Sequence, residues 1–259
     1  MLSTARLSET APGTPLLIVH GLFGSARNWG VISKRLSDRG PVIAVDQRNH
    51  GDSPQTATHS YPDMAADLAE VIATTGGAAD VLGHSMGGKA AMVLALTRPD
   101  LVSRLIVADI APVHYTHSQM PYLRAMRDLD LDGITSRSEA DQRLRTTVED
   151  LPTRAFLLQS LDVARRTWRL NLATLEAEMD KIMGFPEIAG RYDGPVLFLS
   201  GGASDYVRPE HRAGIKALFP QARFVKIPGA GHWLHAEKPR EFEAAVRVFL
   251  DATAGYQAS

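Results

Sequence analysis

Ser85 lies at the centre of GHSMG (residues 83–87), which matches the pattern G-x-S-x-G. An apolar run precedes the motif and an amphipathic stretch follows it, which predicts a sharp strand-to-helix turn with the serine at its tip. The two flanking glycines suit such a turn because neither brings a side chain into it. We therefore expect Ser85 to be a nucleophile; the alternative is a glycine-rich turn that only begins a helix.

His232 is the candidate base for this serine. A serine hydroxyl is a poor nucleophile at neutral pH and needs an imidazole within hydrogen-bonding reach to accept its proton. His232 stands in GAGHW (residues 229–233), where glycines place it on a short loop after an apolar run. His235 is the alternative base, although its position favours the start of the closing helical segment.

Two aspartates are candidates for the acid that orients the imidazole. Asp109 ends the apolar run 105–109, and Asp205 follows the run 196–200. Both would lie at the edge of the sheet where Ser85 is expected. The aspartate that is not the acid would cap a helix or accept hydrogen bonds from loop N–H groups. The residues alone leave both candidates open.

HGLFG (residues 20–24) follows the first apolar run and is a candidate for an oxyanion hole. Glycines let the backbone approach a ligand, and the peptide N–H of Leu22, with that of Met86, could point at one oxyanion. Two such donors are already in position when the tetrahedral intermediate forms, so they stabilise its negative charge without a rearrangement of the protein. We expect His20 to support this loop rather than to catalyse.

Histidines also occur in two other segments, for which we expect no part in the reaction. The turn DQRNHGDS (residues 46–53) is rich in Asn, Gly and Asp, so we expect Arg48 and His50 to support that loop. His114 and His117 are three positions apart, a spacing that metals can use on a helix. No further ligand is in register with them, and we therefore expect no metal site.

Short runs rich in Val, Ile and Leu alternate with amphipathic stretches along the chain. Their length and two-sided apolar character predict buried parallel strands at residues 16–20, 42–46, 79–83, 105–109, 196–200 and 223–227. The amphipathic stretches predict helices at residues 63–73, 86–96 and 241–250. This alternation predicts an α/β fold in which helices cover both faces of an open, mostly parallel sheet.

Residues 112–191 interrupt the alternation with helical periodicity and charge but no convincing strand. A structureless loop of this length would be unusual, so we expect a helical cap within the same folding unit. The cap would lie over the carboxyl ends of the strands, where open parallel sheets bind ligands. Residues 1–111 and 192–259 would form the core.

Several side chains could contact a substrate. We expect substrate contacts from Phe23, Trp168 and Trp233. Apolar residues of the insertion could line a cavity, although their helical spacing is more typical of a core; these are Met120, Leu123, Met126, Phe156, Leu157 and Met183. Three arginines could meet a phosphate-bearing substrate, but a solvated helical face is the favoured interpretation; these are Arg165, Arg166 and Arg169.

Composition narrows the class of protein further. The 28 Lys and Arg residues against 29 Asp and Glu give a formal net charge of −1, which disfavours nucleic acid as a partner. The chain has no cysteine, which excludes thiolate nucleophiles and disulfides and suits a reducing compartment. No apolar stretch has the length of a membrane span and no secretory signal is recognisable, so we expect a cytoplasmic protein. The near-neutral charge and the single compact unit suit a monomer and a homodimer equally.

At this point a family resemblance is evident. HGLFGS, DQRNHGDS, GHSMGG, DIAPV and GAGHWLHAEKP occur in this order, and the chain resembles the α/β-hydrolases over nearly its whole length. HGLFGSARNWG, GHSMGGKAAM and WRLNLATLEAEMDKIMGFP are similar to the YbfF-like bacterial esterases and thioesterases and to the related mitochondrial abhydrolase domain proteins. The resemblance implies a cap inserted after the sixth strand of the standard fold. Little chain precedes Leu16, so we expect one opening antiparallel strand and seven strands in all.

The resemblance implies a serine hydrolase that cleaves carboxylic (acyl) esters or thioesters of small molecules through an acyl-enzyme, without a cofactor. Carried over by position, the roles are nucleophile Ser85, base His232, and oxyanion donors Leu22 and Met86. Close relatives favour Asp109 as the acid, whereas the wider superfamily more often places the acid where Asp205 stands. A carbon–carbon hydrolase or a cofactor-free acyltransferase could use the same residues, and a non-catalytic ligand-binding module is the third alternative.

Overall fold

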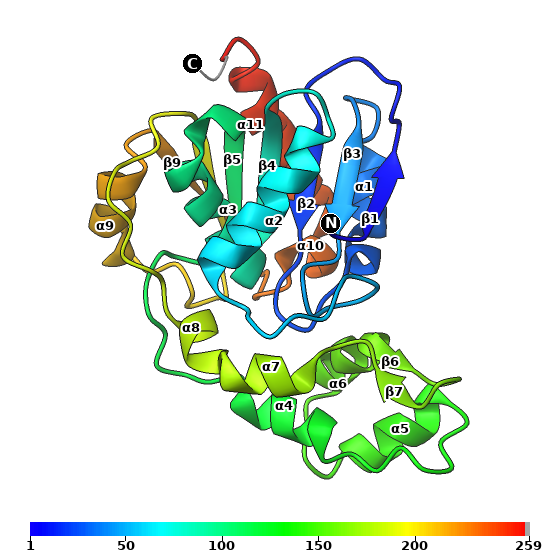
Figure 1. Ribbon diagram of the computed structural model, residues 1–259. Coiled ribbons are helices and arrows are strands. Elements are labelled where there is room, and N and C mark those ends of the chain that lie inside the picture. Colours follow the sequence, from blue (N-terminus) through cyan, green and yellow to red (C-terminus); the bar gives the residue numbers. More distant parts are fainter. Residues whose placement is uncertain (257–259) are drawn as a thin grey trace.

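A seven-stranded sheet forms the centre of the structure, a computed structural model that describes residues 1–256 (Figure 1). The strand order is β1-β3-β2-β4-β5-β8-β9; β1 pairs antiparallel with β3, and all other pairings are parallel. The strands are β1 (Thr4–Leu7), β2 (Leu16–Val19), β3 (Val42–Val45), β4 (Ala79–His84), β5 (Val102–Ala108), β8 (Val196–Gly201) and β9 (Ala222–Ile227). The predicted fold class, with seven strands of which one is antiparallel, is confirmed.

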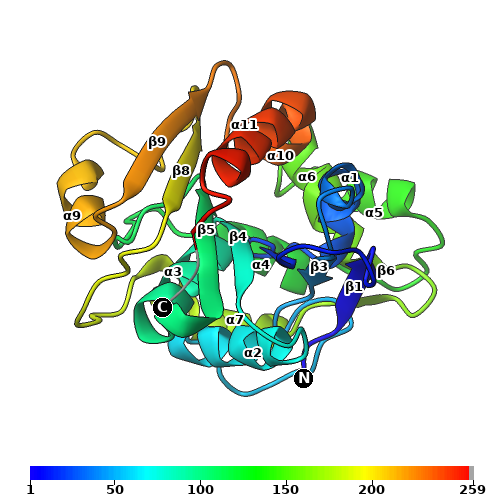
Figure 2. The same cartoon turned by 90° about the horizontal axis from the view of Figure 1, so that it is seen from above.

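Helices cover both faces of the sheet, as Figure 2 shows from above. One face carries α2 (Tyr61–Ala73), α3 (Met86–Thr97) and α9 (His211–Leu218), and the other carries α1 (Gly30–Leu36), α10 (Leu234–Glu237) and α11 (Pro239–Ala252). Short 3-10 helices are η1 (Ala26–Trp29) and η2 (Pro99–Leu101). Side chains alternate along β2: Leu17 and Val19 pack into the core under one face, and Leu16 and Ile18 into the core under the other. Two-sided burial explains why the strands are apolar throughout.

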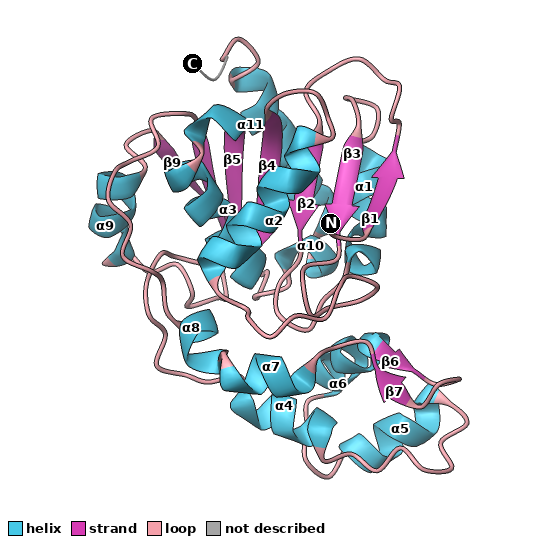
Figure 3. Ribbon diagram, in the orientation of Figure 1, coloured by secondary structure: helices cyan, strands magenta, loops and turns pink. Residues whose placement is uncertain are grey.

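The segment between β5 and β8 lies beyond the carboxyl ends of the parallel strands and is mainly helical (Figures 1 and 3). Its helices are α4 (Met120–Arg127), α5 (Arg137–Leu144), α6 (Leu151–Leu157), η3 (Leu158–Ser160), α7 (Leu172–Ala177) and α8 (Met179–Met183). Three of them begin at a side chain that accepts a hydrogen bond from the third helical N–H: Ser136 before α5, Asp150 before α6 and Asn171 before α7. Polar caps thus divide this segment into short helices.

One expectation for this segment was wrong. Residues 112–191 were expected to contain no strand, but β6 (Leu161–Asp162) and β7 (Thr167–Trp168) form a small antiparallel hairpin (Figure 3). Two-residue strands are too short to produce a detectable apolar alternation, so the pattern could not reveal them. Across residues 1–256, every helix is too short or too polar to span a lipid bilayer.

Candidate active site

Ser85 occupies the sharp turn between β4 and α3. Its backbone has φ +52° and ψ −122°, a conformation that L residues rarely adopt, and its N–H donates to the carbonyl of Ala108 at 3.0 Å. A Cβ on Gly83 would lie 2.3 Å from the carbonyl oxygen of Gly87, and one on Gly87 would lie 2.4 Å from the carbonyl oxygen of His20. The turn therefore tolerates no side chain at either flanking position.

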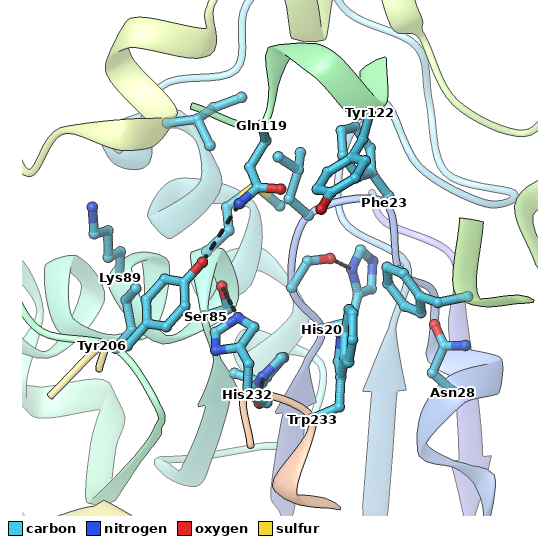
Figure 4. Close-up of a pocket in the computed structure, with 18 of the residues that line it drawn as sticks. His20, Phe23, Asn28, Ser85, Lys89, Gln119, Tyr122, Tyr206, His232 and Trp233 are labelled. Carbon is cyan, nitrogen blue, oxygen red and sulfur yellow. Dashed lines mark hydrogen bonds between the residues drawn. The ribbon is translucent and has the colours of Figure 1, made fainter. Parts of the chain in front are cut away.

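A chain of hydrogen bonds runs from Ser85 through His232 to Asp109. The Ser85 Oγ lies 3.1 Å from His232 Nε2 (Figure 4), and His232 Nδ1 lies 2.8 Å from Asp109 Oδ2. With the proton on Nδ1, His232 donates to the carboxylate and its Nε2 accepts from the serine hydroxyl. Asp109 is fully buried, whereas the His232 side chain is 21% exposed and Ser85 is half-buried, so the serine and the imidazole face the cavity side of the site.

Asp109 is held by donors from two neighbouring segments. Its Oδ1 accepts from the N–H of Gly201 at 3.0 Å, and its Oδ2 accepts from the Ser204 hydroxyl at 2.5 Å. Its backbone φ is +52°, which turns the chain sharply at the end of β5. Gly201 ends β8, the neighbour of β5, and Ser204 follows it. These contacts therefore hold the carboxylate beside the end of β8, with Oδ2 2.8 Å from His232 Nδ1. Ser204 was not among the site residues predicted from the sequence.

The other candidate acid, Asp205, is one residue further along that loop but faces solvent. Its side chain is exposed, and its main-chain oxygen accepts from the Arg208 guanidinium at 3.1 Å. Within residues 1–256, the Asp205 carboxylate makes no hydrogen bond to His232. The structure therefore brings Asp109, and not Asp205, to the imidazole.

The expected oxyanion donors belong to the two turns that face each other across Ser85. Leu22 follows β2 and Met86 is the first residue of α3, and both line the cavity above the serine. In the described part of the chain, neither main-chain N–H donates to a protein acceptor. A helix N-terminus and a glycine-rich loop are regions where free N–H groups bind negative charge.

Two buried histidines support the loop that carries Leu22. His20 Nδ1 donates to the carbonyl of Gly21 at 2.7 Å, and His50 Nε2 accepts from the N–H of Phe23 at 3.1 Å. Burial lowers the pKa of His20 to about 4 and that of His50 to about 3, so both imidazoles are neutral near pH 7. His20 was expected to support this loop, whereas His50 was expected to support the turn at residues 46–53; the structure joins that turn to the Leu22 loop through His50.

His84 and His235 lie behind the catalytic histidine candidate. The Nε2 of His84 donates to the carbonyl of His232 at 2.8 Å, which helps to fix the position of that loop. His235, the alternative base, stacks on Trp29 with ring centroids 4.1 Å apart, and burial lowers its pKa to about 3. No hydrogen bond joins it to Ser85 within the described residues. His84 directly precedes Ser85 in the motif and was not among the site residues predicted from the sequence.

A cavity of about 210 Å³ opens above Ser85, and its wall is mostly aromatic and aliphatic (Figure 4). Phe23 and Trp233, two of the expected substrate contacts, line it. The segment between β5 and β8 contributes further lining residues, among them Tyr122, Thr153, Phe156, Leu157, Ile182 and Met183. The other apolar residues considered there do not line the cavity: Leu123 and Met126 are buried in the hydrophobic core, and Met120 packs against it.

Trp168, the third expected substrate contact, lies elsewhere. It is 8% exposed on β7, and its indole N–H donates to the carbonyl of Met126 at 2.8 Å, so it ties the hairpin to α4. It is not part of the cavity wall. Arg169 likewise pairs with Asp52 and Asp162 at 2.8 and 3.0 Å and is not a free cation.

His117, considered above as a metal ligand with His114, contacts the Tyr206 hydroxyl. Its Nε2 lies 2.9 Å from the Tyr206 hydroxyl, and the Tyr206 ring stacks on His232 with centroids 4.0 Å apart. Among residues 1–256, no three His, Cys, Asp or Glu side chains gather as a metal site would require.

The fold and this arrangement of side chains define a class of protein. The chain belongs to the α/β-hydrolase fold family, whose model matches residues 14–239. It is 45% identical to the sn-1-specific diacylglycerol lipase ABHD11 of Mus musculus, over 96% of this chain and 85% of that protein. It is 38% identical to the esterase YbfF of Escherichia coli strain K12, over 92% and 93% of the two chains.

A solved structure gives the same result. A marine microorganism esterase superposes with a TM-score of 0.91 at 38% identity, over 96% of this chain and 99% of that one. The predicted resemblance to YbfF-like esterases and abhydrolase proteins is confirmed. These relatives also confirm the predicted class of enzyme, a carboxylic ester hydrolase.

Proposed function

We propose that the protein hydrolyses acyl esters or thioesters through an acyl-enzyme on Ser85, with His232 as base and Asp109 as the orienting acid. The observation that carries the proposal is the hydrogen-bonded chain from Ser85 Oγ to His232 Nε2 at 3.1 Å and from His232 Nδ1 to Asp109 Oδ2 at 2.8 Å. A purely binding site has no need of a strained serine aligned with an imidazole and a buried carboxylate.

Acylation begins with proton transfer from Ser85 Oγ to His232 Nε2 as Oγ attacks the acyl carbonyl carbon. Asp109 accepts from Nδ1–H and so stabilises the imidazolium that forms. The carbonyl oxygen gains negative charge, which the N–H groups of Leu22 and Met86 bind. The intermediate then collapses: the bond to the alcohol or thiol breaks, and the leaving group takes the proton from Nε2.

Deacylation repeats these steps with water. A water molecule gives a proton to His232 Nε2 and attacks the acyl carbon. The second tetrahedral intermediate breaks its bond to Ser85 Oγ, which recovers the proton from Nε2. The products are a carboxylic acid and the free enzyme.

The cavity wall indicates which end of the substrate it receives. Aromatic and aliphatic side chains dominate the wall above Ser85, and such a surface favours an acyl chain over a charged group. We assign residues 112–191 as a cap, because Phe156, Leu157 and Met183 close the cavity from that segment. The names of the relatives, a diacylglycerol lipase and esterases, support an acyl ester as the substrate class.

The test is hydrolysis of p-nitrophenyl esters with short and long acyl chains, beside a monoacylglycerol and an acyl-CoA, by the wild type and by Ser85→Ala. We expect Ser85→Ala to lower kcat by at least about a thousandfold on every ester that the wild type cleaves. Far-UV circular dichroism serves as the folding control. Turnover by Ser85→Ala at the wild-type rate would refute the proposal.

A further inference from the structure

Lys89 is a buried lysine with no role in the steps above. It lies on α3, where its N–H donates to the carbonyl of Ser85 at 3.1 Å, and its side chain forms part of the cavity wall (Figure 4). Lys89 is only 1% exposed, and burial lowers its pKa to about 7. Within residues 1–256, no carboxylate forms an ion pair with it. A buried ammonium without a counter-ion is costly, so its other contacts must compensate.

Those contacts come from the end of α8. The Lys89 ammonium donates to the carbonyl oxygens of Met183 at 2.9 Å and of Gly184 at 2.5 Å. These oxygens belong to the last turn of the helix and the residue after it, where carbonyls have no partner within the helix. The negative end of a helix dipole attracts a cation, and hydrogen bonds from a charged donor are stronger than neutral ones.

Two tyrosine rings complete the surroundings. The ammonium lies 4.8 Å from the ring centroid of Tyr115 and 5.7 Å from that of Tyr61, within the range of a cation–π contact. Both tyrosines also hold the end of α8: the N–H of Tyr115 donates to Met183 at 3.0 Å, and the hydroxyl of Tyr61 donates to the carbonyl of Ile182 at 2.5 Å. Three consecutive carbonyls are thus bound around one cation.

This cluster joins both ends of the helical segment to α3. Tyr115 lies shortly after the chain leaves β5, and Met183 lies shortly before it returns to β8. Ile182 and Met183 are also part of the cavity wall. We propose that Lys89 is a positioning residue that anchors the base of the cap on α3 and thereby fixes the wall against which the acyl chain packs.

The anchoring stands on the contacts alone, whereas the effect on the acyl chain rests on the proposed function. The main test variant is Lys89→Met, which keeps an unbranched apolar side chain and removes the charge and the donors of the ammonium. Lys181→Met is the matched control, because Lys181 is on α8 but 59% exposed and, among the described residues, forms an ion pair with Glu178 alone. Lys89→Arg keeps a cation and donors at the same place.

Hydrogen exchange gives a readout that does not depend on activity. We expect the peptide covering residues 180–188 to exchange about tenfold faster in Lys89→Met than in the wild type, since the hydrogen bonds from the charged donor to this turn are lost. Lys181→Met should match the wild type, and Lys89→Arg should recover most of the protection. Lys89→Gln, uncharged and shorter, is measured in parallel and should move in the same direction.

Kinetics then test the cavity wall. We expect Lys89→Met to raise KM for p-nitrophenyl octanoate by about tenfold while kcat/KM for the acetate changes less than about threefold. Equal exchange in Lys89→Met and Lys181→Met, or equal effects on both esters, would overturn the proposal. A wild type that cleaves no ester would refute the proposed function instead, and exchange would still decide the anchoring.

Discussion

Asp109 is distinguished from Asp205 by its donors. Asp109 is fully buried and accepts from the N–H of Gly201, the hydroxyl of Ser204 and the imidazole of His232, whereas Asp205 is exposed. A buried carboxylate with three donors is fixed in one orientation, and it therefore fixes the imidazole that donates to it. The exposed carboxylate of Asp205 is not fixed in this way and therefore cannot fix the imidazole.

We expect Asp109→Asn to lower kcat by at least about a thousandfold, because an amide in place of the carboxylate favours the wrong imidazole tautomer. Asp205→Asn makes the same change four residues after the end of β8, and its kcat should stay within about twofold of the wild-type value. Steady-state hydrolysis of one p-nitrophenyl ester by both variants provides the comparison. A larger loss in Asp205→Asn would assign the acid to the exposed loop.

Both aspartates could be predicted from the sequence as candidate acids, because each follows a predicted strand. The sequence could not choose between them from spacing, since that choice depends on which carboxylate turns inward after its strand. The positive φ of Asp109 and its hydrogen bond from Ser204 make that difference, and both depend on the pairing of β5 with β8. Ser85 and His232 were easier to predict because flanking glycines mark both turns.

At the level of elements, the strands of the central sheet could be predicted, and the details of the segment between β5 and β8 could not. A central parallel strand such as β4 is buried at all six positions, so its apolar run is visible in the sequence. The hairpin of β6 and β7 has two residues per strand and leaves no such pattern. Trp168, which was expected to contact the substrate, joins that hairpin to α4 through its indole N–H.

Trp168→Phe tests this structural role. The change removes the hydrogen bond to the carbonyl of Met126, and we expect the free energy of unfolding to fall by about 1 to 2 kcal/mol. The kcat/KM for p-nitrophenyl octanoate should remain within about twofold of the wild type, because Trp168 does not line the cavity.

Phe156→Ala is the contrasting variant, since Phe156 is part of the cavity wall and contacts Trp233 with ring centroids 5.4 Å apart. It should raise KM for the octanoate. If Trp168→Phe lowered kcat/KM for the octanoate without lowering the free energy of unfolding, Trp168 would have to contact the substrate. Chemical denaturation and the same ester assay supply both measurements.

At the level of the whole molecule, burial keeps several histidines neutral. The pKa is lowered to about 4 for His20 and to about 3 for both His50 and His235, in each case mainly because burial penalises the charged form. The unfolded chain takes up protons near pH 6.5, whereas the folded protein does not until much lower pH. Stability from these residues is therefore complete above pH 6.5 and lost progressively below it.

We expect the free energy of unfolding to fall between pH 6.5 and 4 with a slope that approaches about 1.4 kcal/mol per pH unit for each such histidine. His235→Phe, which keeps an aromatic ring against Trp29, should reduce the slope by about one proton. Urea denaturation at several pH values gives the slope. A stability that is constant from pH 7 to 5 would contradict the burial of neutral imidazoles.

The overall architecture was accessible from the sequence because alternating strands and helices permit few topologies. The cavity was not, because its wall combines residues of β-strand loops with residues of α6 and α8 that are far apart in the chain. Phe156, Leu157 and Met183 line the cavity whereas Met120, Leu123 and Met126 do not, and their helical spacing is alike in both groups.

The most direct test of the central claim is to capture the acyl-enzyme. The protein is mixed with p-nitrophenyl butyrate, quenched in acid within the first turnover, digested and analysed by mass spectrometry. We predict that the peptide containing Ser85 gains the mass of one butyryl group, and that Ser85→Ala and His232→Ala show no such adduct. Ester cleavage by the wild type with no adduct on Ser85, or with the adduct on another residue, would contradict the account.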